Sequence, residues 1–225
     1  MFSLWRPCSH AETCNDGIMN TEQSFDAVVE EDIEDKKAAL RAKVRACRKK
    51  LTPQARKEAA KKILDAAAPL LEREDETIAS YVPVNAEPDV MGIANEAFRQ
   101  GKEVLLPRLG PKLSRTWALY RGPGDLQVHA PGRPPAPSGE ILSPDVISRA
   151  GLLILPALSI DRSGNRLGQG GGWYDHILEN ASADACICAV VYTSEFLDAE
   201  DALPIAPHDK KVNAVLTPAG FLYLN

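Results

Sequence analysis

The stretch that decides the fold is Gly151-Leu-Leu-Ile-Leu-Pro-Ala-Leu-Ser-Ile-Asp-Arg-Ser-Gly-Asn-Arg-Leu-Gly-Gln-Gly-Gly-Gly-Trp-Tyr-Asp175. Its first apolar run, residues 152–155, lies between a glycine and a proline, which is typical of a parallel strand covered on both faces. Residues 161–165 have the composition of a tight turn, in which Gly164 or Asn165 can take a positive φ. From Trp173 onward the sequence predicts the first turns of a helix.

Between this turn and this helix lies a loop that is nearly free of side chains. After Arg166 come Gly168, Gly170, Gly171 and Gly172, so backbone N–H groups can approach an anion closely. The N-terminus of the following helix would face the same anion. The spacing is not that of a dinucleotide-binding fingerprint, and the chain has no Gly-Lys-Ser or Gly-Lys-Thr triplet of a P-loop. The sequence therefore predicts a phosphate-binding loop outside both standard nucleotide motifs.

The amino-terminal segment differs in composition from the rest of the 225-residue chain. Residues 1–35 hold nine acidic residues and one basic residue without sustained periodicity, which predicts a flexible tail before a single domain over 36–225. No apolar run is long enough to span a membrane, and the amino terminus lacks the apolar core of a secretory signal. The five cysteines, an odd number, fit a reducing compartment. We therefore expect a cytoplasmic protein with no membrane partner.

Residues 36–51 predict a helix with one apolar stripe and a file of cations beside it. The apolar positions are Leu40, Val44, Cys47 and Leu51, and the cations are Lys37, Arg41, Arg45 and Arg48. Residues 36–62 hold twelve basic residues and one acid, which is compatible with a solvated face or a nucleic-acid surface. The absence of interleaved aromatic residues and the net charge of −5 argue against nucleic acid.

The remaining pattern predicts a three-layer α/β/α fold with a mainly parallel central sheet. Helices are expected from Thr52-Pro53 to about Ala68 and over 90–99. Strands are expected at 77–82, 102–106, around 117–120, 186–192 and 212–216, with a proline- and glycine-rich loop at 122–144. Glu87 follows the first of these strands, and ligands of open α/β sheets bind beyond the carboxyl ends of strands. Composition alone favours an ordinary loop acid near a helix N-terminus over a ligand-binding residue.

Two segments resemble a known family. Arg166-Leu-Gly-Gln-Gly-Gly-Gly-Trp-Tyr-Asp175, with the residues leading into it from Leu155, is similar to the signature of the 5-formyltetrahydrofolate cyclo-ligases, or 5,10-methenyltetrahydrofolate synthetases. That family usually has tyrosine where this chain has Trp173. Near the start, Lys37-Ala-Ala-Leu-Arg41 matches the family's Lys-x-x-Leu-Arg helix. The resemblance runs from about residue 37 to the carboxyl terminus and implies the same α/β fold.

The resemblance implies ATP-dependent closure of 5-formyltetrahydrofolate to 5,10-methenyltetrahydrofolate, with release of ADP and phosphate. ATP would be bound by Lys37, Arg41, Arg166, Leu167, Gly168, Gln169, Gly170, Gly171, Gly172, Trp173 and Tyr174. The catalytic residues would be Lys37, Arg166 and Tyr174, and the folate would contact Val82, Glu87, Trp173 and Tyr174. Mg²⁺ would be held by Asp175 and Asp209, whereas Asn213 stands where many members have another aspartate.

Two other interpretations stay open. A non-catalytic nucleotide- or RNA-binding module could use the basic helix, and a sugar-phosphate isomerase or CoA transferase could share a related layered fold. The cyclo-ligase interpretation expects a monomer whose partners are the small molecules ATP and 5-formyltetrahydrofolate. It also requires Lys37 and Arg166, which are far apart in the sequence, to border one cleft.

Overall fold

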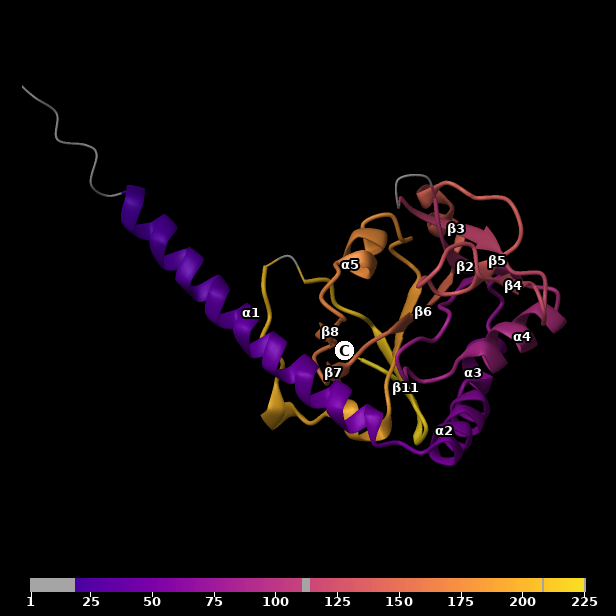
Figure 1. Cartoon of the computed structure of the whole chain (residues 1–225), viewed down its shortest axis with the longest axis horizontal. Coiled ribbons are helices and arrows are strands. Elements are labelled where there is room, and N and C mark those ends of the chain that lie inside the picture. Colours follow the sequence, from indigo (N-terminus) through magenta and orange to yellow (C-terminus); the bar gives the residue numbers. More distant parts are fainter. Residues whose placement is uncertain (1–18, 111–113, 208, 225) are drawn as a thin grey trace, which may run out of the picture.

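The computed structural model describes residues 19–110, 114–207 and 209–224, and its centre is a mainly parallel sheet (Figure 1). Within these residues the main sheet has seven strands in the order β12-β11-β9-β6-β1-β2-β3. They are β1 (Thr77–Ala79), β2 (Glu103–Leu109), β3 (Arg115–Leu119), β6 (Leu152–Pro156), β9 (Cys186–Val190), β11 (Ala214–Thr217) and β12 (Gly220–Tyr223). Only the two edge strands, β3 and β12, pair antiparallel with their neighbours. The predicted sheet type is confirmed.

Smaller strands and the helices surround this sheet. One small sheet has the order β10-β7-β8, and β4 pairs with β5. Their bounds are β4 (Leu126–Gln127), β5 (Ala136–Pro137), β7 (Ser159–Asp161), β8 (Arg166–Leu167) and β10 (Phe196–Leu197). The α-helices are α1 (Met19–Lys49), α2 (Pro53–Ala66), α3 (Ala68–Leu71), α4 (Met91–Arg99) and α5 (Trp173–Leu178). Short 3₁₀ turns are η2 (Pro144–Arg149), η3 (Thr193–Glu195) and η4 (Ala199–Asp201).

Helices cover both faces of the main sheet, which makes the fold three-layered. Along β6, Leu152 and Ile154 belong to one apolar core, which also holds residues of α2, α3 and α4. Leu153 and Leu155 point the other way, into a second core that holds residues of η2 and α5. Because successive side chains of a strand point to opposite faces, the fully apolar run of β6 is the sequence signature of this double coverage.

The first helix is longer than the sequence predicted. α1 begins at Met19, not near Lys36, and in Figure 1 its first half extends away from the sheet. Residues 19–35 are therefore helical, residues 1–18 lie outside the described part of the chain, and the flexibility expected of residues 1–35 stays a prediction. Within that described part, no helix combines the length and apolar character that crossing a membrane requires.

The contact face of α1 also differs from the predicted apolar stripe. Cys47 is exposed, whereas Lys37 and Arg48 are buried, and Leu40 and Val44 are half-buried against a small apolar cluster at the β7–β8 hairpin. The predicted file of cations is thus part of the contact face. The physical reason is that α1 packs on loops rich in carbonyl and carboxylate oxygens, which give the cations buried partners.

One further strand prediction needs correction, and several short strands were not predicted. β2 does not end before Pro107 but continues to Leu109, paired with β3. Proline is tolerated there because β1 pairs only with residues 103–105 of β2, so no parallel neighbour requires its missing N–H. β12 and the β10-β7-β8 sheet were not predicted, because strands of two to four residues carry too little alternation to be recognised.

Candidate functional site

One cavity of about 1040 Å³ is lined by all the residues that were predicted to bind substrates or metal. It lies beyond the carboxyl ends of β1 and β6, where α/β sheets bind ligands. Its lining includes Lys37, Arg41, Val82, Glu87, Arg166, Leu167, Gly168, Gln169, Gly170, Gly171, Gly172, Trp173, Tyr174, Asp175 and Asp209. Lys37 and Arg166 therefore border a shared cleft, as the cyclo-ligase interpretation requires. The roles of the individual residues remain predictions.

The glycine loop, residues 168–172, joins β8 to α5 and is held by arginines. Arg41 Nε donates to the Gly168 carbonyl at 3.0 Å, and Arg115 Nη2 donates to the Gly171 carbonyl at 3.1 Å. Gly170 has a φ of +94°, and a Cβ there would lie 3.4 Å from Arg41 Cζ. The backbone conformation thus favours glycine at this position, whereas a Cβ would make only ordinary van der Waals contact with the guanidinium. α5 is short, with six residues.

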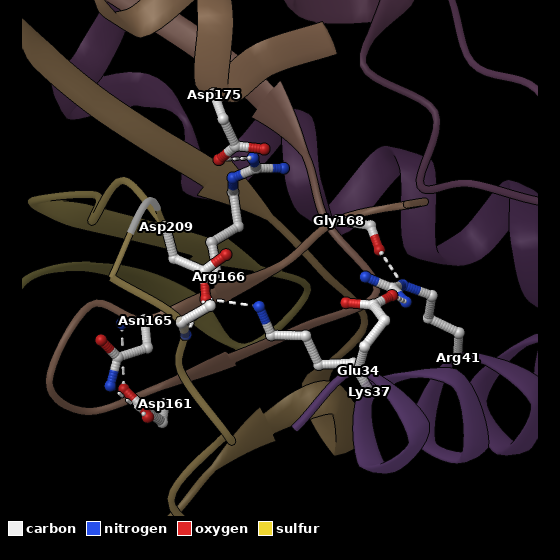
Figure 2. A network of polar contacts seen from close by, with 10 residues as sticks. Glu34, Lys37, Arg41, Asp161, Asn165, Arg166, Gly168, Asp175 and Asp209 are labelled. Atoms are coloured by element: carbon white, nitrogen blue, oxygen red, sulfur yellow. Dashed lines mark hydrogen bonds and ion pairs between the residues drawn. The ribbon is translucent and has the colours of Figure 1, made fainter. Parts of the chain in front are cut away.

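Each cation predicted to bind phosphate contacts a carboxylate in this structure (Figure 2). Lys37 Nζ lies 2.5 Å from Asp209, and Arg166 Nη2 donates to Asp175 at 2.8 Å. Arg41 Nη1 contacts Glu34 at 2.5 Å, and both residues belong to α1. The side chains of Lys37 and Arg166 are only 5% and 2% exposed. Both predicted metal ligands are therefore paired with predicted phosphate ligands.

Arg166 is oriented on several sides. Besides its ion pair with Asp175, it donates from Nη1 to the Pro156 carbonyl at 3.4 Å. Its Cζ lies 5.9 Å from the centroid of the Tyr174 ring. Its Nε is buried and has no hydrogen-bond partner in the described part of the chain. Leaving a buried donor of this kind unpaired costs free energy.

The turn that precedes Arg166 is built by Asp161. Its carboxylate accepts hydrogen bonds from the backbone of Ser163 and Asn165 and from the Asn165 side chain. Gly164, not Asn165, takes the positive φ, at +78°. A Cβ at Gly164 would lie 2.3 Å from the Val212 carbonyl oxygen, so the close approach requires glycine. This turn closes the β7–β8 hairpin and thereby places Arg166 in the cavity.

Glu87 provides a buried carboxylate on another side of the cavity. Its Oε2 accepts from the Val84 backbone N–H at 3.0 Å, and its Oε1 accepts from Gln169 Nε2 at 2.9 Å. Burial raises the pKa of Glu87, while these two hydrogen bonds and the charge of Arg48 act in the opposite direction. Such a carboxylate can accept a pair of N–H groups from a guanidine-like ligand.

The backbone before Glu87 is strained. Asn85 and Ala86 have φ values of +50° and +61°, and alanine rarely adopts this left-handed region. Tyr192 holds the turn, because its hydroxyl donates to the Ala86 carbonyl at 3.3 Å. Asn85 is a residue type that tolerates this region, but neither the conformation of Ala86 nor the contact with Tyr192 has a local signal in the sequence.

The two aromatic residues at the start of α5 border the same cavity. Burial raises the pKa of Tyr174, with the charge of Glu87 acting in the same direction, so its phenol stays neutral and can donate a hydrogen bond. Trp173 Nε1 is buried with no partner in the described residues. The Arg115 guanidinium lies 6.0 Å from the Trp173 ring centroid.

Several cavity residues were missed by sequence reasoning. They are Glu34, Arg108, Arg115 and Arg133. Arg108 donates from Nη1 to the Pro137 and Gly139 carbonyls, so it ties β2 to the proline-rich segment. His129 also has partners, since its Nε2 contacts the Ala136 and Pro137 carbonyls. Their only sequence signal is a charge beside a strand end or in a loop, which is common.

The described residues contain no group of three or more histidine, cysteine, aspartate or glutamate side chains that could hold a metal ion. Asn213 has a structural contact: its Oδ1 accepts from the Ile187 backbone N–H and its Nδ2 donates to the Ala185 carbonyl. Cys186 and Cys188 lie in the apolar core. A metal at this site would therefore need ligands from a bound substrate in addition to Asp175 and Asp209.

Comparisons with known proteins point to one family. The model of the 5-formyltetrahydrofolate cyclo-ligase family matches residues 33–218. A 5-formyltetrahydrofolate cyclo-ligase from Mycolicibacterium smegmatis is 40% identical over 149 residues, which cover 63% of this chain and 73% of that protein. The NMR structure of 5,10-methenyltetrahydrofolate synthetase from Aquifex aeolicus is 25% identical with a TM-score of 0.70, covering 84% of this chain and 93% of that one. The synthetase from Mycoplasma pneumoniae shares the fold, with a TM-score of 0.61, 17% identity, and coverage of 80% and 97%.

Proposed function

Because this chain belongs to the 5-formyltetrahydrofolate cyclo-ligase family, ligases that convert 5-formyltetrahydrofolate to 5,10-methenyltetrahydrofolate, we propose that it uses ATP and Mg²⁺ and releases ADP and phosphate. The observation that supports this proposal most directly is the shared cavity. There, two nearly buried cations, Lys37 and Arg166, lie with the glycine loop and with the carboxylate of Glu87. Such a cavity can hold a polyanion and a guanidine-like ring side by side.

ATP would occupy the part lined by Lys37, Arg41, Arg166 and the glycine loop. Each of the three cations now contacts a carboxylate, and a phosphate oxygen can replace that carboxylate with the same charge and similar geometry. The buried Lys37 and Arg166 would contribute most, because electrostatic attraction is strongest where water is excluded. Arg41 lies nearer the surface and would contribute less.

The donor set fits Mg²⁺. Asp175 and Asp209 offer hard carboxylate oxygens on the same cavity, and Mg²⁺ usually takes one or two carboxylates and completes its shell with phosphate oxygens and water. When bound with ATP, the ion would neutralise part of the polyphosphate charge. Asp175 and Asp209 would then bind the ion and no longer pair with Arg166 and Lys37. These two cations could then bind the phosphates.

The folate would bind with its pterin edge on Glu87. The carboxylate can accept two parallel N–H groups from this edge, as it would from an arginine. Val82, Trp173 and Tyr174 would border the ring and the reacting formyl group. The neutral phenol of Tyr174 can donate a hydrogen bond there without adding negative charge beside the phosphates.

The formyl oxygen of 5-formyltetrahydrofolate is a poor leaving group, so the reaction has to activate it before the ring can close. Transfer of the γ-phosphoryl group to the formyl oxygen breaks its bond to ADP and forms an iminium phosphate. The folate N10 then attacks the formyl carbon and loses its proton, and the C–O bond breaks to release phosphate and leave the methenyl bridge. In such a reaction the protein contributes mainly positioning and charge neutralisation. We assign this neutralisation to Lys37 and Arg166, the two buried cations that line the cavity.

The decisive experiment follows methenyl-folate formation by absorbance, with ATP, Mg²⁺ and 5-formyltetrahydrofolate each omitted in turn. The proposal expects turnover only when all three are present. Product formed without ATP would contradict it and would favour an isomerase- or transferase-like activity. Salt-sensitive oligonucleotide binding by residues 36–62, without folate-dependent ATP consumption, would favour the RNA-binding module.

A further inference from the structure

The side chain of Gln169 points to the folate part of the cavity, although Gln169 belongs to the glycine loop. Its Nε2 donates to Glu87 Oε1 at 2.9 Å. On its other side, Arg45 Nη2 donates to Gln169 Oε1 at 2.9 Å and to the Gln169 backbone carbonyl at 2.8 Å. Gln169 thus forms a bridge from α1 to the buried carboxylate.

These contacts define the orientation of the amide. Its oxygen can only accept hydrogen bonds and its nitrogen can only donate them. Arg45 offers only donors, and the ionised Glu87 offers only acceptors, so a single orientation of the Gln169 amide satisfies both. A reversed amide would place a donor against a guanidinium and an acceptor against a carboxylate.

We propose that Gln169 is a positioning residue for the folate, that its amide holds the Glu87 carboxylate ready for the pterin edge, and that Arg45 holds the amide. This inference rests on the proposed function, because it takes the folate to bind at Glu87. It moves the side chain of Gln169 from the nucleotide site, where the sequence resemblance placed it, to the folate site. The backbone of the loop stays on the nucleotide side.

Gln169 leaves the carboxylate free to bind its ligand. An ionised carboxylate has about four acceptor positions, two on each oxygen. Gln169 occupies one position on Oε1, and the Val84 N–H occupies one on Oε2. One position on each oxygen remains, which is the number that two parallel N–H groups of a pterin require. The amide therefore fixes the carboxylate plane without blocking it.

The surroundings of Glu87 explain why a neutral partner is useful there. The charged and titratable groups around it are Arg48 from α1, Tyr81 after β1 and Tyr174 from α5. Of these, only Arg48 carries a positive charge, and its own hydrogen bonds go to Glu195 and Ala157. Gln169 is the side chain that donates directly to Glu87 in the described structure. A strained turn at Asn85 and Ala86 fixes the backbone of Glu87, and Gln169 fixes its side chain.

The test is an equilibrium titration of the full chain with 5-formyltetrahydrofolate in the absence of ATP, and a separate titration with ADP. Gln169→Met keeps the length of the side chain but removes the donor. We expect it to weaken 5-formyltetrahydrofolate binding about 5- to 20-fold, near the low end of the effect of losing a hydrogen bond to a charged group because Gln169 is exposed, and to change ADP binding less than about twofold. Gln169→Glu, which puts a second carboxylate against Glu87, should weaken folate binding further.

Arg45→Met should weaken folate binding by a smaller factor, about twofold to threefold, because Arg45 acts through the amide and is exposed. Lys43→Met is the matched control, because Lys43 is an exposed cation of the same helix without a hydrogen bond to Gln169 among the described residues. Folate binding should not change in this variant. Because Gln169 is exposed, Gln169→Met should unfold at nearly the same urea concentration as the wild type.

Unchanged folate binding in Gln169→Met would overturn the inference, and so would a loss confined to ADP binding, which would return the side chain to the nucleotide site. The titration contains no ATP, so its result is separate from the test of the proposed reaction. A wild-type protein that binds the folate and loses affinity in Gln169→Met, yet never consumes ATP, would refute the ATP-dependent reaction alone. A wild-type protein that does not bind the folate would refute both.

Discussion

Arg166 and Asp175 form an ion pair, 2.8 Å from Nη2 to Oδ1, across the glycine loop that separates them in the sequence. Arg166 belongs to β8 before the loop, and Asp175 lies in the first turn of α5 after it. The pair therefore joins the two ends of the loop. The arginine side chain is 2% exposed and that of the aspartate 30% exposed, so the cation is held in place while its partner still faces the cavity.

This relationship predicts that Arg166→Ala loses far more activity than stability. Without the guanidinium, the transferred phosphoryl group loses a buried positive charge, and kcat/KM should fall at least about 100-fold. The free energy of unfolding should fall by only about 1–3 kcal/mol, because Asp175 can be solvated from the cavity. Steady-state kinetics and urea unfolding measure the two effects. Arg166→Lys keeps a charge without the planar fork and should lie between; near-normal turnover in Arg166→Ala would contradict the assignment.

The contact between Glu34 and Arg41 predicts that removing the charge of Glu34 improves ATP binding. Its carboxylate contacts Arg41 and lines the cavity, so it competes with phosphate oxygens for that guanidinium. Because Glu34 is 60% exposed, the competition is weak, and Glu34→Gln should lower the KM for ATP by about twofold, more at low salt than at high salt. Asp32→Asn is the control, since Asp32 pairs with Lys36 on the same helix. Equal effects of the two changes would indicate a general charge effect instead.

Glu87 predicts a pH dependence of folate binding. Only the ionised carboxylate accepts two N–H groups, and burial raises the pKa of Glu87 above its ordinary value. The affinity for 5-formyltetrahydrofolate should therefore decrease as the pH falls from about 8 toward about 5, earlier than for an exposed glutamate. Titrations across this range measure the effect. In Glu87→Gln binding should be weak and nearly independent of pH, and a pH dependence that persists in this variant would assign it to another group.

The same raised pKa has a consequence for stability. A carboxyl group whose pKa is higher in the folded state than in the unfolded state stabilises the fold below its unfolded pKa and loses this contribution as the pH rises through the folded pKa. Relative to the wild type, Glu87→Gln should therefore be most favourable at neutral and alkaline pH. Urea unfolding at several pH values tests this. A variant that becomes relatively less stable as the pH rises would contradict the sign of the shift.

The parts of the structure that the sequence predicts well are those with a local signature. The apolar run of β6 is a strand covered on both faces, and the turn at Asp161 and the glycine loop fold as expected. The shared cavity of Lys37 and Arg166 follows from two motifs that have a family resemblance. The strained turn before Glu87 could not be predicted, because its conformation is imposed by distant contacts such as that of Tyr192.

Arg48 shows why the contact face of α1 could not be predicted. Periodicity places apolar residues inside and cations outside, and it has no information on a carboxylate 147 residues later in the chain. The Arg48 Nη2 donates to Glu195 at 2.7 Å and to the Ala157 carbonyl at 2.6 Å. The ion pair with Glu195 makes burial of the Arg48 guanidinium possible, so α1 packs against the domain with the face that carries Arg48. The exposed Cys47 follows from the same rotation.

This buried pair predicts a large loss of stability when one partner is removed. The side chains of Arg48 and Glu195 are 2% and 8% exposed, so Arg48→Met would leave Glu195 as an uncompensated buried charge, at a cost of about 3–5 kcal/mol in the free energy of unfolding. Glu195→Gln should cost a similar amount, because the arginine then lacks its counter-charge. The double variant should be less destabilised than the sum of the two, since it buries no unpaired charge. Urea unfolding of the four proteins measures this coupling, and strict additivity would show that the two side chains stabilise the fold independently.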